Sequence, residues 1–169
     1  MSRYEELCNS YKKYDDDRTA YTDRSRMFIT KLVDGFVLFL GAPADRIRFF
    51  PPEGGKSDQQ YSPIGAATPG EDGWWSIFVQ VTLSRGQGIF PELHARMLFK
   101  VRTEPDKFLV QIGDSKLQHV VTVESVAEMQ PIFNEAFNRS QEYLNSGVQR
   151  FLDETDSNRV GKIGFVCVT

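Results

Sequence analysis

The sequence has few of the residues that build metal sites and nucleophilic centres. It contains only two cysteines and two histidines among its 169 residues. Cys8 and Cys167 lie near opposite ends of the chain, and neither they nor His94 and His119 fall within a Cys-x-x-Cys or His-Glu-x-x-His spacing. A zinc site needs about four nitrogen, sulfur or oxygen ligands in a tetrahedral arrangement. The sequence therefore predicts no metal and no cofactor.

A long apolar run is also missing. The most apolar stretch, residues 36–40, is much shorter than the roughly 18 residues that a membrane-spanning helix needs. Residues 1–18 contain no apolar run like that of a signal peptide. Two isolated cysteines are typical of a reducing compartment. We therefore expect a cytoplasmic protein with no membrane partner.

The chain has no excess of positive charge. Its formal net charge is −3 and its isoelectric point is near 5.4. Domains that bind nucleic acids are usually strongly basic, so the composition argues against a nucleic-acid partner. With 40% hydrophobic and 25% charged residues, the chain has the composition of an ordinary globular domain. We expect residues 1–169 to form a single domain.

The clearest pattern is a succession of three strands within residues 73–113. Side chains alternate between the two faces of a strand, so the parity of each position decides its face. One face is continuously apolar, with Trp75, Ile77, Val79, Val81, Leu83, Ala95, Met97, Phe99, Val101, Phe108, Val110 and Ile112. A four-residue loop, 103–106, would place Arg102 opposite Lys107 and Val101 opposite Phe108. These strands predict an antiparallel meander with one face that must be covered.

Helical periodicity precedes and follows the meander. Residues 22–40 predict one helix, and residues 3–14 predict a separate or kinked one, because a charged run lies between them. A capping-box sequence begins at Ser125, but Pro131 would kink a helix already under way. We therefore expect the second long helix to span residues 131–154, with Phe137 in its apolar stripe.

Shorter strands complete the predicted fold. Residues 46–50, 117–123 and 163–168 have strand-like composition. The sequence predicts an α+β domain: an antiparallel sheet of about five to six strands with a long N-terminal and a long C-terminal helix packed on one face. Residues 51–72 are rich in proline and glycine and have no periodicity, which predicts a long irregular loop and most simply a mobile insertion.

The second face of the predicted sheet mixes cationic and aromatic side chains. Its candidate binding residues are Trp74, Phe78, His94, Arg96, Leu98, Lys100 and Arg102. One interpretation is a solvated face on which lysine stems cover apolar neighbours. The other is a surface for an acidic ligand, because arginine binds carboxylate and phosphate through two parallel hydrogen bonds.

We therefore expect a non-catalytic binding or regulatory protein, which engages an acidic partner through this face. The partner would be another protein or a second copy of the chain, since aromatic residues and arginine dominate protein interfaces. The alternative is a small-molecule-binding or enzymatic domain with a pocket under the 51–72 loop, which would use His119, Asp114, Arg48 and Tyr61. No catalytic residues are predicted for the binding protein.

Overall fold

The computed structural model describes residues 2–53, 59–84, 86, 92–122 and 125–146 and the backbone of residues 167–168. The elements are α1 (Arg3–Leu40), the 3-10 turn η1 (Ala44–Arg46), β1 (Ile47–Phe50), α2 (Pro63–Ala66), β2 (Thr68–Pro69), β3 (Trp74–Leu83), β4 (Leu93–Thr103), β5 (Phe108–Ile112), β6 (His119–Val121), α3 (Val126–Asn145) and β7 (Cys167–Val168). No helix in these ranges is both long enough and apolar enough to span a bilayer.

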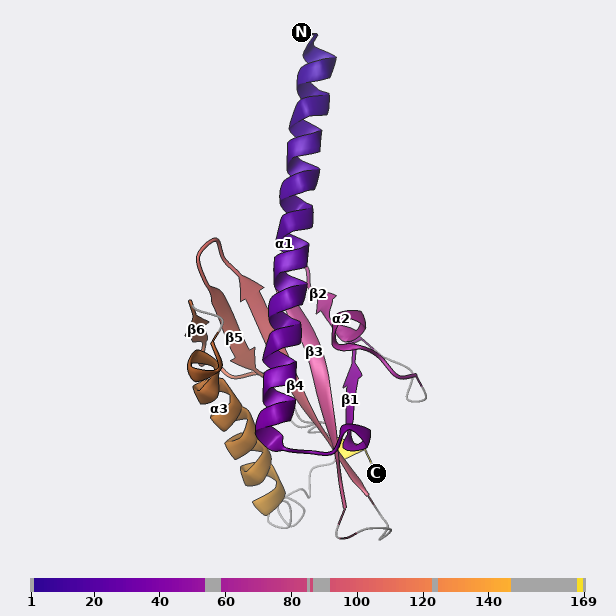
Figure 1. The fold of residues 1–169 in the computed structure, drawn as a ribbon, viewed down its shortest axis with the longest axis vertical. Helices are drawn as coiled ribbons and strands as arrows, with labels where there is room; N and C mark the ends of the chain where they lie inside the picture. The colour runs from indigo at the N-terminus through magenta and orange to yellow at the C-terminus, as the bar shows by residue number, and fades with distance from the viewer. Residues whose placement is uncertain are drawn as a thin grey trace, which may run out of the picture.

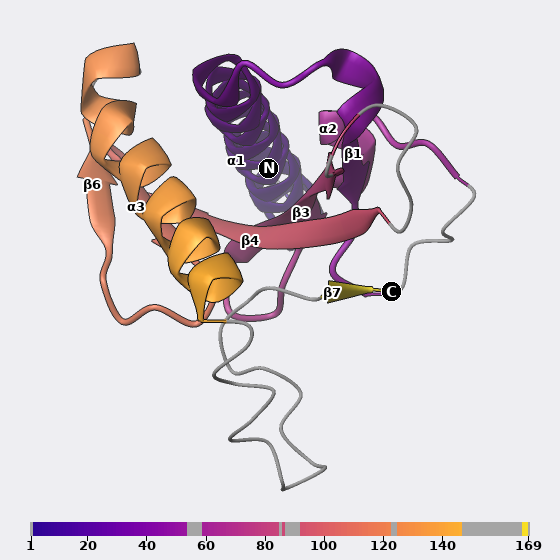
Figure 2. The ribbon, with the colours of Figure 1, turned by 90° about the horizontal axis from the view of Figure 1, so that it is seen from below.

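The strands form one antiparallel sheet in the order β1-β3-β4-β5-β6. The short strand β2 pairs with β3, and β7 pairs with β4. Helices α1 and α3 lie side by side on the same face of this sheet (Figures 1 and 2). The predicted α+β fold, with both long helices on one face, is confirmed.

The hydrophobic core lies between this inner face and the two helices. The predicted apolar set is buried, apart from Leu83, which is partly buried against the core. The rings of Phe28 and Phe108 stack with their centroids 3.8 Å apart. Phe36 contacts the rings of both Phe99 and Phe133. Because each fully buried side chain of this kind stabilises the fold by about 1.5–3 kcal/mol, the cluster fixes both helices on the sheet.

Helix α1 is one continuous helix of 38 residues, so the prediction of two helices was wrong. A capping box closes its first turn: the Ser2 hydroxyl accepts from the Glu5 N–H, and the Glu5 carboxylate accepts from the Ser2 N–H. The helix ends at Gly41, whose φ of 62° is readily available only to glycine. The acidic run at residues 15–17 does not interrupt the helix, because exposed aspartates reduce helix propensity by less than about 1 kcal/mol each.

Helix α3 begins five residues earlier than predicted, at Val126. The Ser125 hydroxyl accepts from the Glu128 N–H at 3.3 Å, as the capping-box sequence suggests. Pro131 is exposed within the helix, where water can bond the carbonyl that its missing N–H leaves free. Phe137 is 38% exposed, so the fully buried aromatic residue of this helix is Phe133. The predicted continuation over 147–154 and most of the strand over 163–168 lie outside the described residues.

The hairpin between β4 and β5 is paired two residues away from the predicted register. Thr103 lies opposite Phe108, where Val101 had been expected. The turn is closed by the Glu104 N–H, which donates to the Lys107 carbonyl at 2.9 Å. Their side chains also form an ion pair at 3.3 Å. Because a shift of two positions leaves each side chain on its own face, the predicted faces were correct although the pairing was not.

Part of the 51–72 segment is packed into the protein. Residues 59–72 include α2 and β2, and Ala66 and Ala67 belong to the core cluster at 0% and 5% exposure. The Ser62 hydroxyl caps α2 by accepting from the Gly65 N–H at 3.1 Å. The prediction of an unpacked insertion was therefore wrong for this part, since two alanines without periodic neighbours give no signal of burial. Residues 54–58 lie outside the described residues.

Candidate functional site: a cationic hollow on the outer face of the sheet

The predicted binding residues all lie on the sheet face opposite α1 and α3, which we call the outer face. Strand pairing sets Trp74 opposite Arg102 and Phe78 opposite Leu98. His94 and Arg96 lie near the other end of β4. Arg96 and Arg102 are six positions apart along the strand, which corresponds to roughly 20 Å. The structure therefore distributes these side chains along one face and does not gather them at one point.

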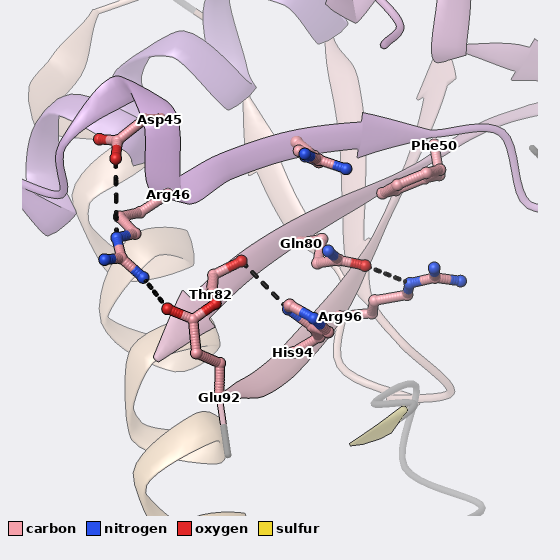
Figure 3. A pocket seen from close by; sticks show the side chains of 9 residues that line it. Asp45, Arg46, Phe50, Gln80, Thr82, Glu92, His94 and Arg96 are labelled. Carbon is pink, nitrogen blue, oxygen red and sulfur yellow. Dashed lines mark hydrogen bonds and ion pairs between the residues drawn. The ribbon is translucent and has the colours of Figure 1, made fainter. Parts of the chain in front are cut away.

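A hollow of about 430 Å3 lies at the end of the outer face where β1, β3 and β4 meet (Figure 3). Its lining consists of Asp45, Arg46, Arg48, Phe50, Gln80, Thr82, Glu92, His94 and Arg96. Three arginines against two carboxylates give this lining an excess of one positive charge before His94 is counted. The hollow therefore favours an anionic group.

Arg96 is held in the hollow by neutral neighbours. Its Nε donates to the Gln80 side-chain oxygen at 2.8 Å, and Gln80 is itself buried. The guanidinium lies over the ring of Phe50, 4.5 Å from the centroid. Burial lowers the pKa of Arg96. Within the described part of the chain no carboxylate forms an ion pair with Arg96, and its two terminal nitrogens make no hydrogen bond.

The second arginine of the hollow, Arg46, is neutralised within the protein. Its Nη1 lies 2.6 Å from a Glu92 carboxylate oxygen, and its Nε lies 3.7 Å from Asp45 (Figure 3). The hydrogen bond and the charge of Glu92 raise the pKa of Arg46. Because the Arg46 guanidinium already has carboxylate partners, it lines the hollow but its charge is not available to a ligand. Arg96 is a cation that a ligand would meet, and the exposed Arg48 also lines the hollow.

His94 and Thr82 form a hydrogen-bonded pair on the same strands. The Thr82 hydroxyl and His94 Nδ1 are 3.1 Å apart. A hydroxyl beside an imidazole has the form of a nucleophile with its base, but such pairs use a third group to orient the base. In the described ranges no third group forms a hydrogen bond or ion pair with His94 Nε2. The pair can donate or accept hydrogen bonds to a ligand.

The remaining predicted residues form a half-buried strip along the outer face. Trp74, Phe78 and Leu98 are half-buried, and Arg102 is exposed at the far end. The charge of Lys100 is offset by Asp114, 4.0 Å away. The outer face is thus an apolar strip between two arginines rather than a uniformly basic surface.

The residues expected to form a pocket under the 51–72 segment do not come together. A hollow of about 390 Å3 lies there, and its lining includes Arg48, Tyr61 and Asp34. Burial raises the pKa of Asp34. His119 lies elsewhere and bonds to Glu135 between β6 and α3, where Arg139 also contacts that carboxylate at 3.0 Å. Of the predicted set, only Arg48 and Tyr61 share this hollow.

Comparisons of the chain with protein-family models, with curated proteins and with solved structures found no match. Among the described residues, no group of three or more histidine, cysteine, aspartate or glutamate side chains comes together to hold a metal ion. The outer face must therefore be interpreted from its own geometry.

Several residues of the hollow were not among the predicted site residues. Strand alternation places Arg48 and Phe50 on the face opposite Ile47, so this part could have been found from the sequence. The pairing of β1 with β3, which brings Phe50 opposite Phe78, is a long-range contact with no local signal. The ion pair of Arg46 with Glu92 joins residues 46 positions apart and was equally hidden.

Proposed function

We propose that the protein is a non-catalytic binding protein that takes an acidic group of a partner protein into the outer-face hollow. The observation that supports this function is Arg96, a half-buried guanidinium whose bonded neighbours are neutral. Removing a charge from water without a counter-ion costs free energy. A bound carboxylate would offset that cost and would occupy the terminal nitrogens that Gln80 leaves free.

The strip beside the hollow supports a peptide segment as the ligand. Phe78 and Leu98 are cross-strand neighbours between the hollow and the far end of the face, where Arg102 is exposed. A strand of six or seven residues spans roughly 20 Å, which is the separation of Arg96 and Arg102 along β4. We therefore expect an extended segment with an acidic residue at each end and apolar residues between.

A labelled heptapeptide tests this proposal directly. The probe has glutamate at both ends and alternating leucine and phenylalanine between them, and its partner probe has glutamine at both ends. We expect only the acidic peptide to bind and the glutamine peptide not to bind. The affinity of the acidic peptide should fall as salt screens the charges. Binding that is equal for both peptides would contradict the proposal.

Variants of the protein locate the contact. Arg96→Gln should abolish binding, and Arg96→Lys should weaken it, because lysine keeps the charge but loses the two-pronged geometry. Lys116→Gln is the matched control, since it removes one exposed cation from the turn after β5. Thermal melting would verify that each variant is folded. Unchanged binding by a folded Arg96→Gln variant would assign the peptide to another surface.

The small-molecule alternative has one observation in its favour. Asp34 lines the hollow beneath residues 60–61, and burial raises its pKa. A perturbed carboxyl in a hollow is a candidate functional group. If this hollow is the binding site, Asp34→Asn rather than Arg96→Gln should alter ligand binding. The observation is weaker, because His119 and Asp114, two of the four predicted polar groups, lie elsewhere.

A further inference from the structure

The first half of α1 carries four large apolar side chains that lie in water. Tyr4, Leu7, Tyr11 and Tyr14 are 76%, 70%, 68% and 62% exposed. Their spacing of three, four and three residues is that of the a and d positions of a heptad. Such spacing aligns all four side chains along one side of the helix.

This stripe continues the side of α1 that packs on the sheet. After Arg18 and Tyr21, the following heptad positions are Ser25, Phe28 and Leu32, and all three are fully buried. At the boundary, the Tyr21 hydroxyl donates to the Gly73 carbonyl at 3.0 Å. Towards the N-terminus the helix extends beyond the sheet (Figure 1), so the same side has no described element beneath it. The stripe therefore has the pattern of a packed surface without its packing partner.

We propose that this segment, residues 2–16, pairs with the same segment of a second copy of the chain in an antiparallel arrangement. In antiparallel helix pairs, a positions face d positions. A single register satisfies this rule throughout the segment: Tyr4 faces Tyr14 of the second copy, and Leu7 faces Tyr11. The arrangement is self-complementary about a two-fold axis, as in most homodimers.

The charges beside the stripe favour the same register. Arg3 and Asp17 occupy g positions on one flank of the stripe, two heptads apart. In the antiparallel register Arg3 and Asp17 of the second copy lie on the same flank and differ in height by about 3 Å. A parallel, in-register pair would instead set Arg3 at the height of Arg3 and Asp17 at the height of Asp17. Opposite charges across a helix pair select orientation and partner.

The length of the exposed segment fits the register as well. In this register the N-terminal end of each helix, at Ser2, lies opposite Asp16 of the other copy. The globular part begins at Tyr21, five residues further along, which corresponds to about 7.5 Å of helix. The helices can therefore pair over the whole stripe before a tip reaches the sheet of the other copy. Pairing of residues 2–16 alone buries less surface area than a stable protein interface. We therefore expect reversible association that depends on concentration.

Sedimentation analysis over a range of protein concentrations tests the association. We expect a monomer–dimer equilibrium, and at least a tenfold weaker one for the double variant Leu7→Ala with Tyr11→Ala. Both side chains are exposed, so the fold should not change. The matched control is Leu38→Ala with Met27→Ala, which truncates two exposed apolar residues elsewhere on α1. A monomer at concentrations up to about 1 mM, or equal weakening by the control, would overturn the proposal.

Charge exchange tests the register. Asp17→Lys should weaken association, because it sets two cationic side chains at nearly the same height on one flank. Adding Arg3→Glu to that variant should restore it, since the pair is then present with reversed signs. Failure of the second substitution to restore association would exclude this register.

Cross-linking tests the orientation. In the antiparallel pair the two Cys8 residues share one flank and differ in height by about 3 Å. A short bis-maleimide should therefore link them in a Cys167→Ser background. The control moves the thiol by one residue, with Cys8→Ser and Asn9→Cys, onto the side of the helix away from the stripe. Equal cross-linking of the two proteins would contradict the antiparallel pairing.

Discussion

The hydroxyl groups of Ser25 on α1 and Thr103 at the end of β4 form a buried hydrogen bond of 2.7 Å. Ser25 also donates its single proton to the Tyr21 carbonyl at 2.8 Å. Thr103 must therefore donate to Ser25. This bond lies where α1 first meets the sheet, so it marks the boundary between the projecting half of the helix and the packed half.

The direction of this bond predicts unequal effects for its two partners. Ser25→Ala leaves the buried Thr103 hydroxyl without an acceptor and should lower the free energy of unfolding by about 1–3 kcal/mol. Thr103→Val removes the donor, while Ser25 keeps its bond to Tyr21, so its cost should be about 0.5–1.5 kcal/mol. Urea unfolding of both variants and of the double variant measures the coupling. Strictly additive effects would show that the two hydroxyls do not interact.

Gly35 gives a second prediction because a side chain there would meet Phe133. A Cβ atom built at Gly35 lies 2.9 Å from the tip of the Phe133 ring, and that ring is fully buried. Gly35→Ala should lose about 1–3 kcal/mol to overpacking and regain about 1 kcal/mol from helix propensity. We expect a net destabilisation of about 1 kcal/mol. In a Phe133→Leu background the same substitution should become neutral or stabilising, and denaturant unfolding of the four proteins checks this.

The sequence was sufficient to predict which face of the meander and which side of α1 pack in the core. Strand parity and helical spacing identified the buried face of the meander and the apolar side of α1, because both follow from local backbone geometry. The register of strand pairing and the first residue of each helix were harder to predict. The pairing of Thr103 with Phe108 depends on a turn in which Glu104 and Lys107 bond to each other. The start of α3 depends on whether water can donate a hydrogen bond to the backbone carbonyl that the missing N–H of Pro131 leaves free.

The candidate site could be predicted only in part for the same reason. His94 and Arg96 share a face by parity, and the structure places both in the hollow. The aromatic ring beneath Arg96 comes from Phe50, which reaches it through the pairing of β1 with β3. The compensation of Lys100 by Asp114 is a contact between separate strands and turns. Tertiary pairing, rather than residue type, decides which cation of this face lacks a carboxylate.

The burial of Ala66 predicts that the 51–72 segment contributes to stability. Ala66→Asp would place an unpaired carboxylate in the core and should lower the free energy of unfolding by at least about 3 kcal/mol. Ile64→Ser is the matched control in the same short helix, since Ile64 is 50% exposed. Its effect should stay within about 1 kcal/mol. Thermal melting compares them, and equal melting temperatures would mean that α2 does not pack as described.

Phe50 should influence ligand binding through Arg96. Its ring is 2% exposed and lies beneath the guanidinium, so it supports the arginine from one side while Gln80 holds it from another. Phe50→Leu keeps an apolar side chain of similar size and should cost less than about 1.5 kcal/mol of stability. It removes the attraction between the ring and the cation, which is worth about 0.5–2 kcal/mol.

We expect this substitution to weaken binding of the acidic heptapeptide by about 2- to 30-fold, which is the same free energy expressed as an affinity. A role in packing alone would change the melting temperature without changing the dissociation constant of the folded protein. Phe99→Leu is the control, because Phe99 is fully buried on the inner face and touches no part of the hollow. Equal dissociation constants for Phe50→Leu, Phe99→Leu and the parent protein would show that the ring does not position Arg96 for the ligand.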